Sequence, residues 1–181
     1  LQVYGRVMVD LKAHDIPNTV ANTCKHIAPH NPWAVTVHGS GGTEVVKAAV
    51  KELKGTDTIV LVITLLTSIK DESKEIYGRQ PIEQVKAIAQ LAWDAGARGF
   101  VCSPAEAPVL REMFPRATLV TPGVRSVGAD THDQKRVTTP KQAIDGGADH
   151  IVGGRQFFAA TDPVAEVRRV LHDELHVDMA A

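Results

Sequence analysis

Short apolar runs rich in β-branched residues alternate along this chain with longer segments in which apolar residues recur at helical spacing. The runs that predict β-strands are 6–12, 34–38, 58–65, 98–103, 117–121 and 149–153. The segments that predict helices are 18–27, 42–53, 81–95, 104–113, 139–146 and 163–174. This alternation is typical of repeated βα units, whose strands form a parallel sheet that is covered on both faces.

Several helix ends are marked by local sequence signals. Thr139 and Gln142 enclose a proline, and this order predicts a capping box at the start of a helix. Asp162 and Asn18 each stand beside a proline and are expected to cap the helices that follow them. Gly96 stands where a left-handed residue is expected to end a helix.

A parallel sheet of this kind is either open or closed into a (β/α)₈ barrel. Polar residues follow the predicted strands directly, at 10–15, 38–42, 67–68, 103, 125–136 and 154–155. Barrel enzymes hold their catalytic groups on loops at this end of the strands, so we expect a TIM (β/α)₈ barrel. A complete barrel needs about 250 residues. We therefore expect residues 1–181 to form a single barrel domain, N-terminally incomplete, with about six βα units.

Composition limits the possible partners. Lys plus Arg number 20 and Asp plus Glu number 21, so no basic field favours nucleic acid. The longest apolar run, 58–66, is too short to span a bilayer, and we expect no membrane association. Cys24 and Cys102 form no paired motif and are expected to be reduced core residues of a cytoplasmic protein. The histidines show no metal-binding spacing, so we expect no metal site.

The richest group of charged residues ends the first predicted strand. Side chains alternate along a strand, so Asp10 and Lys12 share one face, and Asp15 follows in the loop. A structural ion pair at a strand end accounts for Asp10 and Lys12 alone. Two carboxylates around one lysine favour a functional role, because they would keep the amine protonated and orient it as an acid.

A second group of residues suits a phosphate. Arg125 follows a predicted strand and opens a long polar loop, and Gly154 and Arg155 follow the next strand. Glycine amides and arginine side chains bind phosphate well, and barrels often bind it after their last two strands. The alternative is a solvated loop with incidental charge. Ser103 could likewise bind a ligand or simply cap the next helix.

Seven stretches in chain order closely resemble the bacterial type of orotidine 5′-phosphate decarboxylase: DLKAHDIPNTV, VHGSGG, LLTS, FVCSPAEA, LVTPGVR, DQKRVTTPKQAI and IVGGRQ. The resemblance runs from about residue 6 to residue 170. The D-x-K-x-x-D pattern alone is shared with related sugar-phosphate decarboxylases and aldolases, whereas TPGVR together with DQKR is specific to this family. The resemblance implies a barrel of the ribulose-phosphate-binding type.

The resemblance also implies an activity and a set of site residues. The family converts orotidine 5′-monophosphate to UMP and CO₂, the last step of de novo pyrimidine nucleotide synthesis, as a homodimer without metal or organic cofactor. Asp10 would lie against the substrate carboxylate, and Lys12 would deliver a proton to C6 of the pyrimidine. Asp15 and Thr19 would reach into the partner's site. The implied substrate-binding residues are Ile16, Thr19, Thr67, Ser103, Pro122, Arg125, Gln134, Gly154 and Arg155.

The sequence departs from the family pattern in two respects. The family has two further N-terminal strands, with a ribose-binding aspartate on the first and a second catalytic lysine on the second. Family members often read Gly-Arg-Pro where this chain has Gln156 as the third residue. Two alternatives therefore stay open: a magnesium-dependent sugar-phosphate lyase of the same superfamily, and a truncated homologue that binds nucleotide without turnover.

Overall fold

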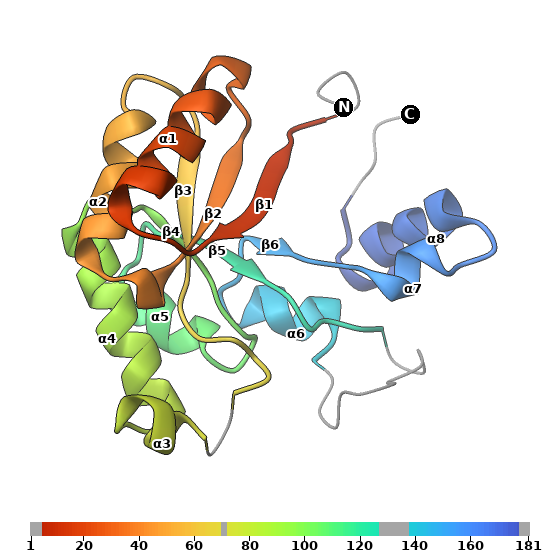
Figure 1. The fold of residues 1–181 in the computed structure, drawn as a ribbon. Coiled ribbons are helices and arrows are strands. Elements are labelled where there is room, and N and C mark those ends of the chain that lie inside the picture. The colour runs from red at the N-terminus through yellow and green to blue at the C-terminus, as the bar shows by residue number, and fades with distance from the viewer. Residues whose placement is uncertain (1–4, 70–71, 127–137, 178–181) are drawn as a thin grey trace.

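The computed structural model describes residues 5–69, 72–126 and 138–177, and its six strands form one parallel sheet in the order β1-β2-β3-β4-β5-β6 (Figure 1). The strands are β1 Met8–Ala13, β2 Ala34–His38, β3 Ile59–Ile63, β4 Gly99–Val101, β5 Thr118–Thr121 and β6 His150–Ile151. Each predicted strand is confirmed, although β4 and β6 are shorter than expected. Within the described residues, β1 and β6 each pair with a strand on one side only.

Helices follow the strands as expected. They are α1 Pro17–Ile27, α2 Thr43–Glu52, α3 Ser73–Tyr77, α4 Pro81–Asp94, α5 Ala107–Met113, α6 Pro140–Asp145, α7 Arg155–Phe158 and α8 Pro163–Arg169. The segment 163–174, predicted as one helix, changes at Val170 from α8 to a π-helical turn. The short helix α3 was not predicted, because its segment lacks a long apolar periodicity.

Most of the helix-end signals are confirmed. Thr139 and Gln142 form the capping box, Asp162 accepts a hydrogen bond from the backbone of α8, and Gly96 has a left-handed φ of 100°. The prediction that Asn18 caps α1 is wrong. The helix begins at Pro17, because the fixed φ of proline suits the first helical position.

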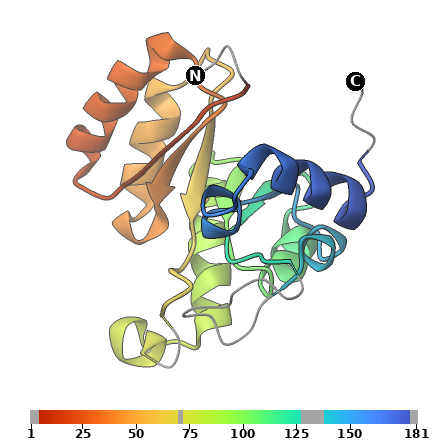
Figure 2. The same cartoon turned by 90° about the vertical axis from the view of Figure 1, so that its right-hand side faces the viewer.

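The sheet is strongly curled. Trp33, just before β2, lies edge-on against His150 of β6, with 4.6 Å between the ring centroids. Four strand spacings would separate these strands by about 19 Å in a flat sheet. Together with the βα order, the curl makes this an incomplete barrel of the TIM type. Figures 1 and 2 show α1 and α2 on one side of it and α7 and α8 on the other.

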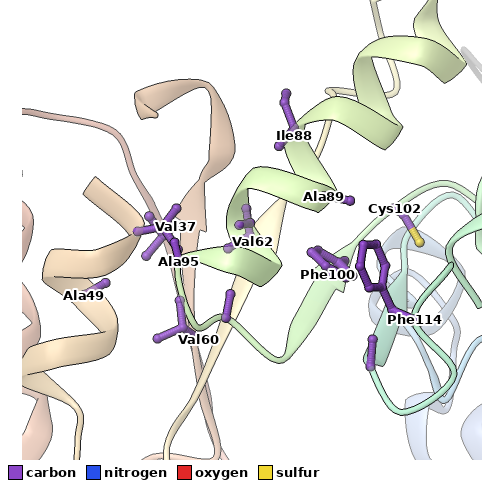
Figure 3. Packing of buried hydrophobic residues seen from close by; sticks show 14 of the residues in the cluster. Val37, Ala49, Val60, Val62, Ile88, Ala89, Ala95, Phe100, Cys102 and Phe114 are labelled. Atoms are coloured by element: carbon purple, nitrogen blue, oxygen red, sulfur yellow. The ribbon is translucent and has the colours of Figure 1, made fainter. Parts of the chain in front are cut away.

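The main core lies between the outer face of the sheet and the helices. Val62 and Phe100, from β3 and β4, point toward Ile88 and Ala89 of α4, and Phe114 packs beside Phe100 (Figure 3). A second, smaller cluster lies on the inner face, where Ala34, Leu61 and Val120 are buried. This alternation of outward and inward side chains follows from the two-residue period of a strand. Because the main core uses the outward side chains, a polar site can form on the inner face.

Candidate active site

The inner face of the sheet contains a cavity of about 290 Å³ at the carboxyl ends of the strands. Its apolar wall includes Val120 and Val152. Four residues predicted for the site line it, namely Asp10, Lys12, Thr67 and Pro122. Lys12 therefore faces the interior of the curled sheet, as its position on the strand predicted, and not the helical layer.

Asp10 and Lys12 form an ion pair on the wall of this cavity. Thr36, on the neighbouring strand β2, donates its hydroxyl proton to Asp10 Oδ1 over 2.8 Å. Burial alone raises the pKa of Asp10, but the hydrogen bonds from Lys12 and Thr36 and the charge of Lys12 outweigh it, so the pKa is lowered. Asp10 is therefore held as a carboxylate beside an ammonium group.

The backbone of Lys12 is unusual. Its φ is 51°, in the left-handed region that residues other than glycine seldom adopt. The register of β1 against β2 shifts between Val9 and Ala13, which marks a bulge or a similar irregularity of the pairing. Instead of joining the ladder, the Lys12 N–H donates to Thr36 Oγ1 over 2.8 Å. Bulges of this kind redirect a side chain and are common beside active sites.

Thr36 was not singled out from the sequence, although a signal for it exists. It is the inward-facing polar residue in the middle of the buried strand β2, with 1% of its surface exposed. Its hydroxyl joins Asp10 and the Lys12 backbone, so it fixes both groups at once. A buried polar side chain of this kind needs partners, and those partners mark the site.

A second polar group lies at the end of β1 and β2. His14 and His38 stack with ring centroids 4.8 Å apart. Ser40 Oγ lies 2.6 Å from His38 Nδ1 and 3.3 Å from His14 Nε2. Burial, and then the charge of His14, lowers the pKa of His38. This cluster joins the loop that carries Asp15 to β2.

Asp15, Ile16 and Thr19 lie at the start of α1 and are exposed. Asp15 Oδ1 accepts a hydrogen bond from the Ile16 N–H over 2.6 Å, and the Ile16 side chain is 65% exposed. None of the three lines the cavity of Asp10 and Lys12. An exposed apolar side chain beside a carboxylate is available to a second chain, and the reach of Asp15 into a partner stays a prediction.

Ser103 begins the segment before α5 and does not line the cavity. Its backbone N–H donates to Glu106 over 2.9 Å, and its carbonyl accepts from the N–H groups of Glu106 and Ala107. Burial raises the pKa of Glu106, an effect larger than that of its hydrogen bonds from Ser103. The contacts of Ser103 are thus those of the turn that leads into α5, whose N-cap is Glu106, and its ligand role stays a prediction.

The residues predicted to bind phosphate lie near the ends of β5 and β6. The N–H of Arg125 donates to Thr138 O over 3.1 Å, and its guanidinium donates to Val124 O over 2.8 Å. Gly154 immediately precedes α7, and Arg155 is the first residue of that helix. These residues do not line the cavity of Asp10 and Lys12. Gln134 lies outside the described residues.

The described residues also bear on two other features, a metal centre and a membrane-spanning helix. Over 5–69, 72–126 and 138–177, no group of three or more His, Cys, Asp or Glu side chains could hold a metal ion. No helix in those same ranges is long and apolar enough to cross a membrane.

Known proteins resemble this chain over most of its length. The model of the "Orotidine 5'-phosphate decarboxylase / HUMPS family" matches residues 2–170. An orotidine 5′-phosphate decarboxylase of Psychromonas ingrahamii is 45% identical over 175 residues, which are 93% of this chain and 74% of that protein. One of Pseudomonas putida GB-1 is 43% identical over 90% of this chain and 75% of its own. The crystal structure of the Lactobacillus acidophilus decarboxylase matches with a TM-score of 0.79 at 36% identity, covering 93% of this chain and 75% of its own.

Proposed function

The chain belongs to the orotidine 5′-phosphate decarboxylase / HUMPS family, and on that premise we propose that it converts orotidine 5′-monophosphate to UMP and CO₂. The observation that carries this proposal is the ion pair of Asp10 and Lys12, held by Thr36 on the wall of an interior cavity. The activity belongs to the last step of pyrimidine nucleotide synthesis, in the cytoplasm. The free, buried cysteines Cys24 and Cys102 support that location.

In the proposed reaction, the bond between C6 and the carboxylate breaks and its electron pair stays on C6. Lys12 Nζ donates a proton to C6, CO₂ leaves, and the amine regains a proton from water. A carbanion at C6 is very unstable in water, so ammonium and carboxylate groups fixed before the reaction are needed to favour its formation. Asp10 would lie against the substrate carboxylate. The two like charges would raise the free energy of the bound substrate relative to that of the transition state.

The proposal includes a homodimer in which Asp15 and Thr19 of one chain complete the site of the other. The exposure of Asp15 and Ile16 at the start of α1 supports it, because neither residue lines the cavity of Asp10 and Lys12 in its own chain. The two sites of a symmetric dimer would then depend on each other.

The proposal assigns the phosphate to Arg125, Gln134, Gly154 and Arg155, and the pyrimidine to Ser103. Thr67 and Pro122, which both line the cavity wall, would also contact the nucleotide. The phosphate is remote from C6, so its binding free energy can be used to place the reacting carbon against Lys12.

The test is to incubate the purified 181-residue chain with orotidine 5′-monophosphate and to measure UMP by chromatography together with released CO₂. The proposal expects equal amounts of both products, and the same rate in EDTA. Loss of activity in EDTA with recovery in Mg²⁺ would favour the sugar-phosphate lyase alternative. Binding of UMP without any turnover would favour the inactive homologue.

A further inference from the structure

Gln156, the second residue of α7, links three parts of the chain. Its Oε1 accepts a hydrogen bond from the backbone N–H of Ser126 over 3.0 Å. Its Nε2 donates to Ser126 Oγ and, over 2.8 Å, to Glu166 Oε1 on α8. A primary amide has one acceptor oxygen and two N–H donors, and here each has a protein partner. Neither methionine nor glutamate could make the same set of bonds.

Arg169 reinforces this link from α8. Its guanidinium donates to Ser126 Oγ over 2.9 Å and to both carboxylate oxygens of Glu166, over 2.9 and 2.8 Å. The hydrogen bonds from Arg169, and then from Gln156, lower the pKa of Glu166 to about 2. The acceptor of Gln156 is thus a carboxylate, and charge-assisted bonds of this kind are the stronger ones. Ser126 is only 5% exposed, which keeps water from competing.

This network lies directly beside the two arginines that are proposed to bind the phosphate. Ser126 directly follows Arg125, and Gln156 directly follows Arg155. Consecutive Cα atoms are about 3.8 Å apart, so a double hydrogen bond between Ser126 and Gln156 limits how far the two arginine backbones can separate. The N–H of Arg125 is also held, by Thr138 O over 3.1 Å.

We propose that Gln156 is a positioning residue, which holds the backbones of Arg125 and Arg155 at the spacing needed for both to bind one phosphate. The inference rests on the part of the proposed function that assigns the phosphate to these arginines. Gln156 itself does not touch the substrate. Its removal therefore weakens the recognition of the phosphate group and leaves recognition of the nucleoside unchanged.

The experiment compares the affinities of UMP and uridine, which differ only in the phosphate, by calorimetry on the full chain. Gln156→Met keeps the length of the side chain and removes its amide. Gln142→Met is the matched control, because Gln142 Oε1 also accepts a backbone N–H, that of Thr139, over 3.0 Å, but on α6. Ser126→Ala is a milder second variant that removes the Oγ contacts and keeps the backbone bond to Gln156.

We expect the preference for UMP over uridine to fall at least tenfold in Gln156→Met and about threefold in Ser126→Ala, with uridine affinity unchanged. We also expect KM for orotidine 5′-monophosphate to rise more than kcat falls in Gln156→Met. The inference is overturned if Gln156→Met keeps the wild-type preference within twofold, loses affinity for both ligands equally, or changes no more than Gln142→Met. Should Gln156→Met not fold, an unchanged preference in Ser126→Ala overturns it.

These outcomes are distinct from a failure of the proposed function. A wild-type chain that prefers UMP but never consumes orotidine 5′-monophosphate contradicts the decarboxylase activity and still supports the role of Gln156, if the variants behave as expected. A wild-type chain that binds UMP no better than uridine contradicts both.

Discussion

The hydroxyl of Thr36 lies 2.8 Å from the carboxylate of Asp10 on the neighbouring strand, and the same hydroxyl accepts the backbone N–H of Lys12 over 2.8 Å. One buried side chain therefore fixes the acid group and the backbone of the lysine together. This relationship makes Thr36 the residue through which the ion pair is oriented.

Thr36→Val keeps the shape of the side chain and removes both bonds. We expect kcat to fall about ten- to hundredfold, because the loss of a hydrogen bond to a charged group is worth about 1.5–3 kcal/mol. Steady-state kinetics with orotidine 5′-monophosphate measures the effect. Thr56→Val is the matched control, since Thr56 also donates to a carbonyl, Leu53 O, and accepts an N–H, that of Thr58, far from the site. Equal losses in both variants would contradict the orienting role.

Lys12→Met tests the proposed proton donor. We expect kcat to fall at least about a thousandfold, because general acid catalysis typically contributes a factor of about 10² to 10⁴ and the charge is lost as well. The matched control is Lys47→Met, since both lysines are 53% exposed in the side chain and both pair with a carboxylate. Exposed ion pairs of this kind contribute about 0–1 kcal/mol, so neither variant should lose more than about 1 kcal/mol of unfolding free energy. Full turnover by Lys12→Met would remove Lys12 from the mechanism.

The cluster of His14, His38 and Ser40 predicts a loss of stability in mild acid. Burial, and then the charge of His14, lowers the pKa of His38, so the unfolded chain binds a proton more readily than the folded one. His38 therefore leaves the folded chain at full stability above the pKa that this residue has in the unfolded chain, about 6.5. That stability is lost as the pH falls through the lower pKa of His38 in the folded chain.

His38→Asn removes the titration and leaves an oxygen acceptor near the position of Nδ1. We expect the unfolding free energy, measured in urea at pH 7.5 and at pH 5, to fall less in this variant than in the wild type. His26→Asn, an exposed position on α1, serves as the control. An unchanged pH dependence in His38→Asn would show that His38 does not titrate within the cluster.

The sequence predicted the strands because buried parallel strands are runs of β-branched residues, and it placed Asp10 and Lys12 together because side chains alternate along a strand. It did not identify Thr36 as their partner, since that depends on the register of β1 against β2, which the run of residues alone does not fix. Gln156 was noted only as a departure from the family pattern. Its role depends on Ser126, a contact across 30 residues that only the tertiary structure brings together.

The last prediction concerns Asp15, which is exposed and does not line the cavity of its own chain. If Asp15 of one chain serves Lys12 of the other, then Lys12→Ala and Asp15→Asn each inactivate their own homodimer. A mixed dimer, however, contains one site with both substitutions and one site with neither. Random mixing makes half of the dimers mixed, so about a quarter of all sites should regain wild-type activity.

The measurement is to unfold the two variants together, refold them at equal concentrations and assay turnover of orotidine 5′-monophosphate. Recovery near a quarter of the wild-type rate is expected, because a symmetric interface brings each Asp15 to the opposite cavity. Mixing without unfolding is the control, and activity should appear only as subunits exchange. If Asp15 acted on the Lys12 of its own chain, every site of the mixed dimer would carry one substitution, and no activity would return at any ratio of the two variants.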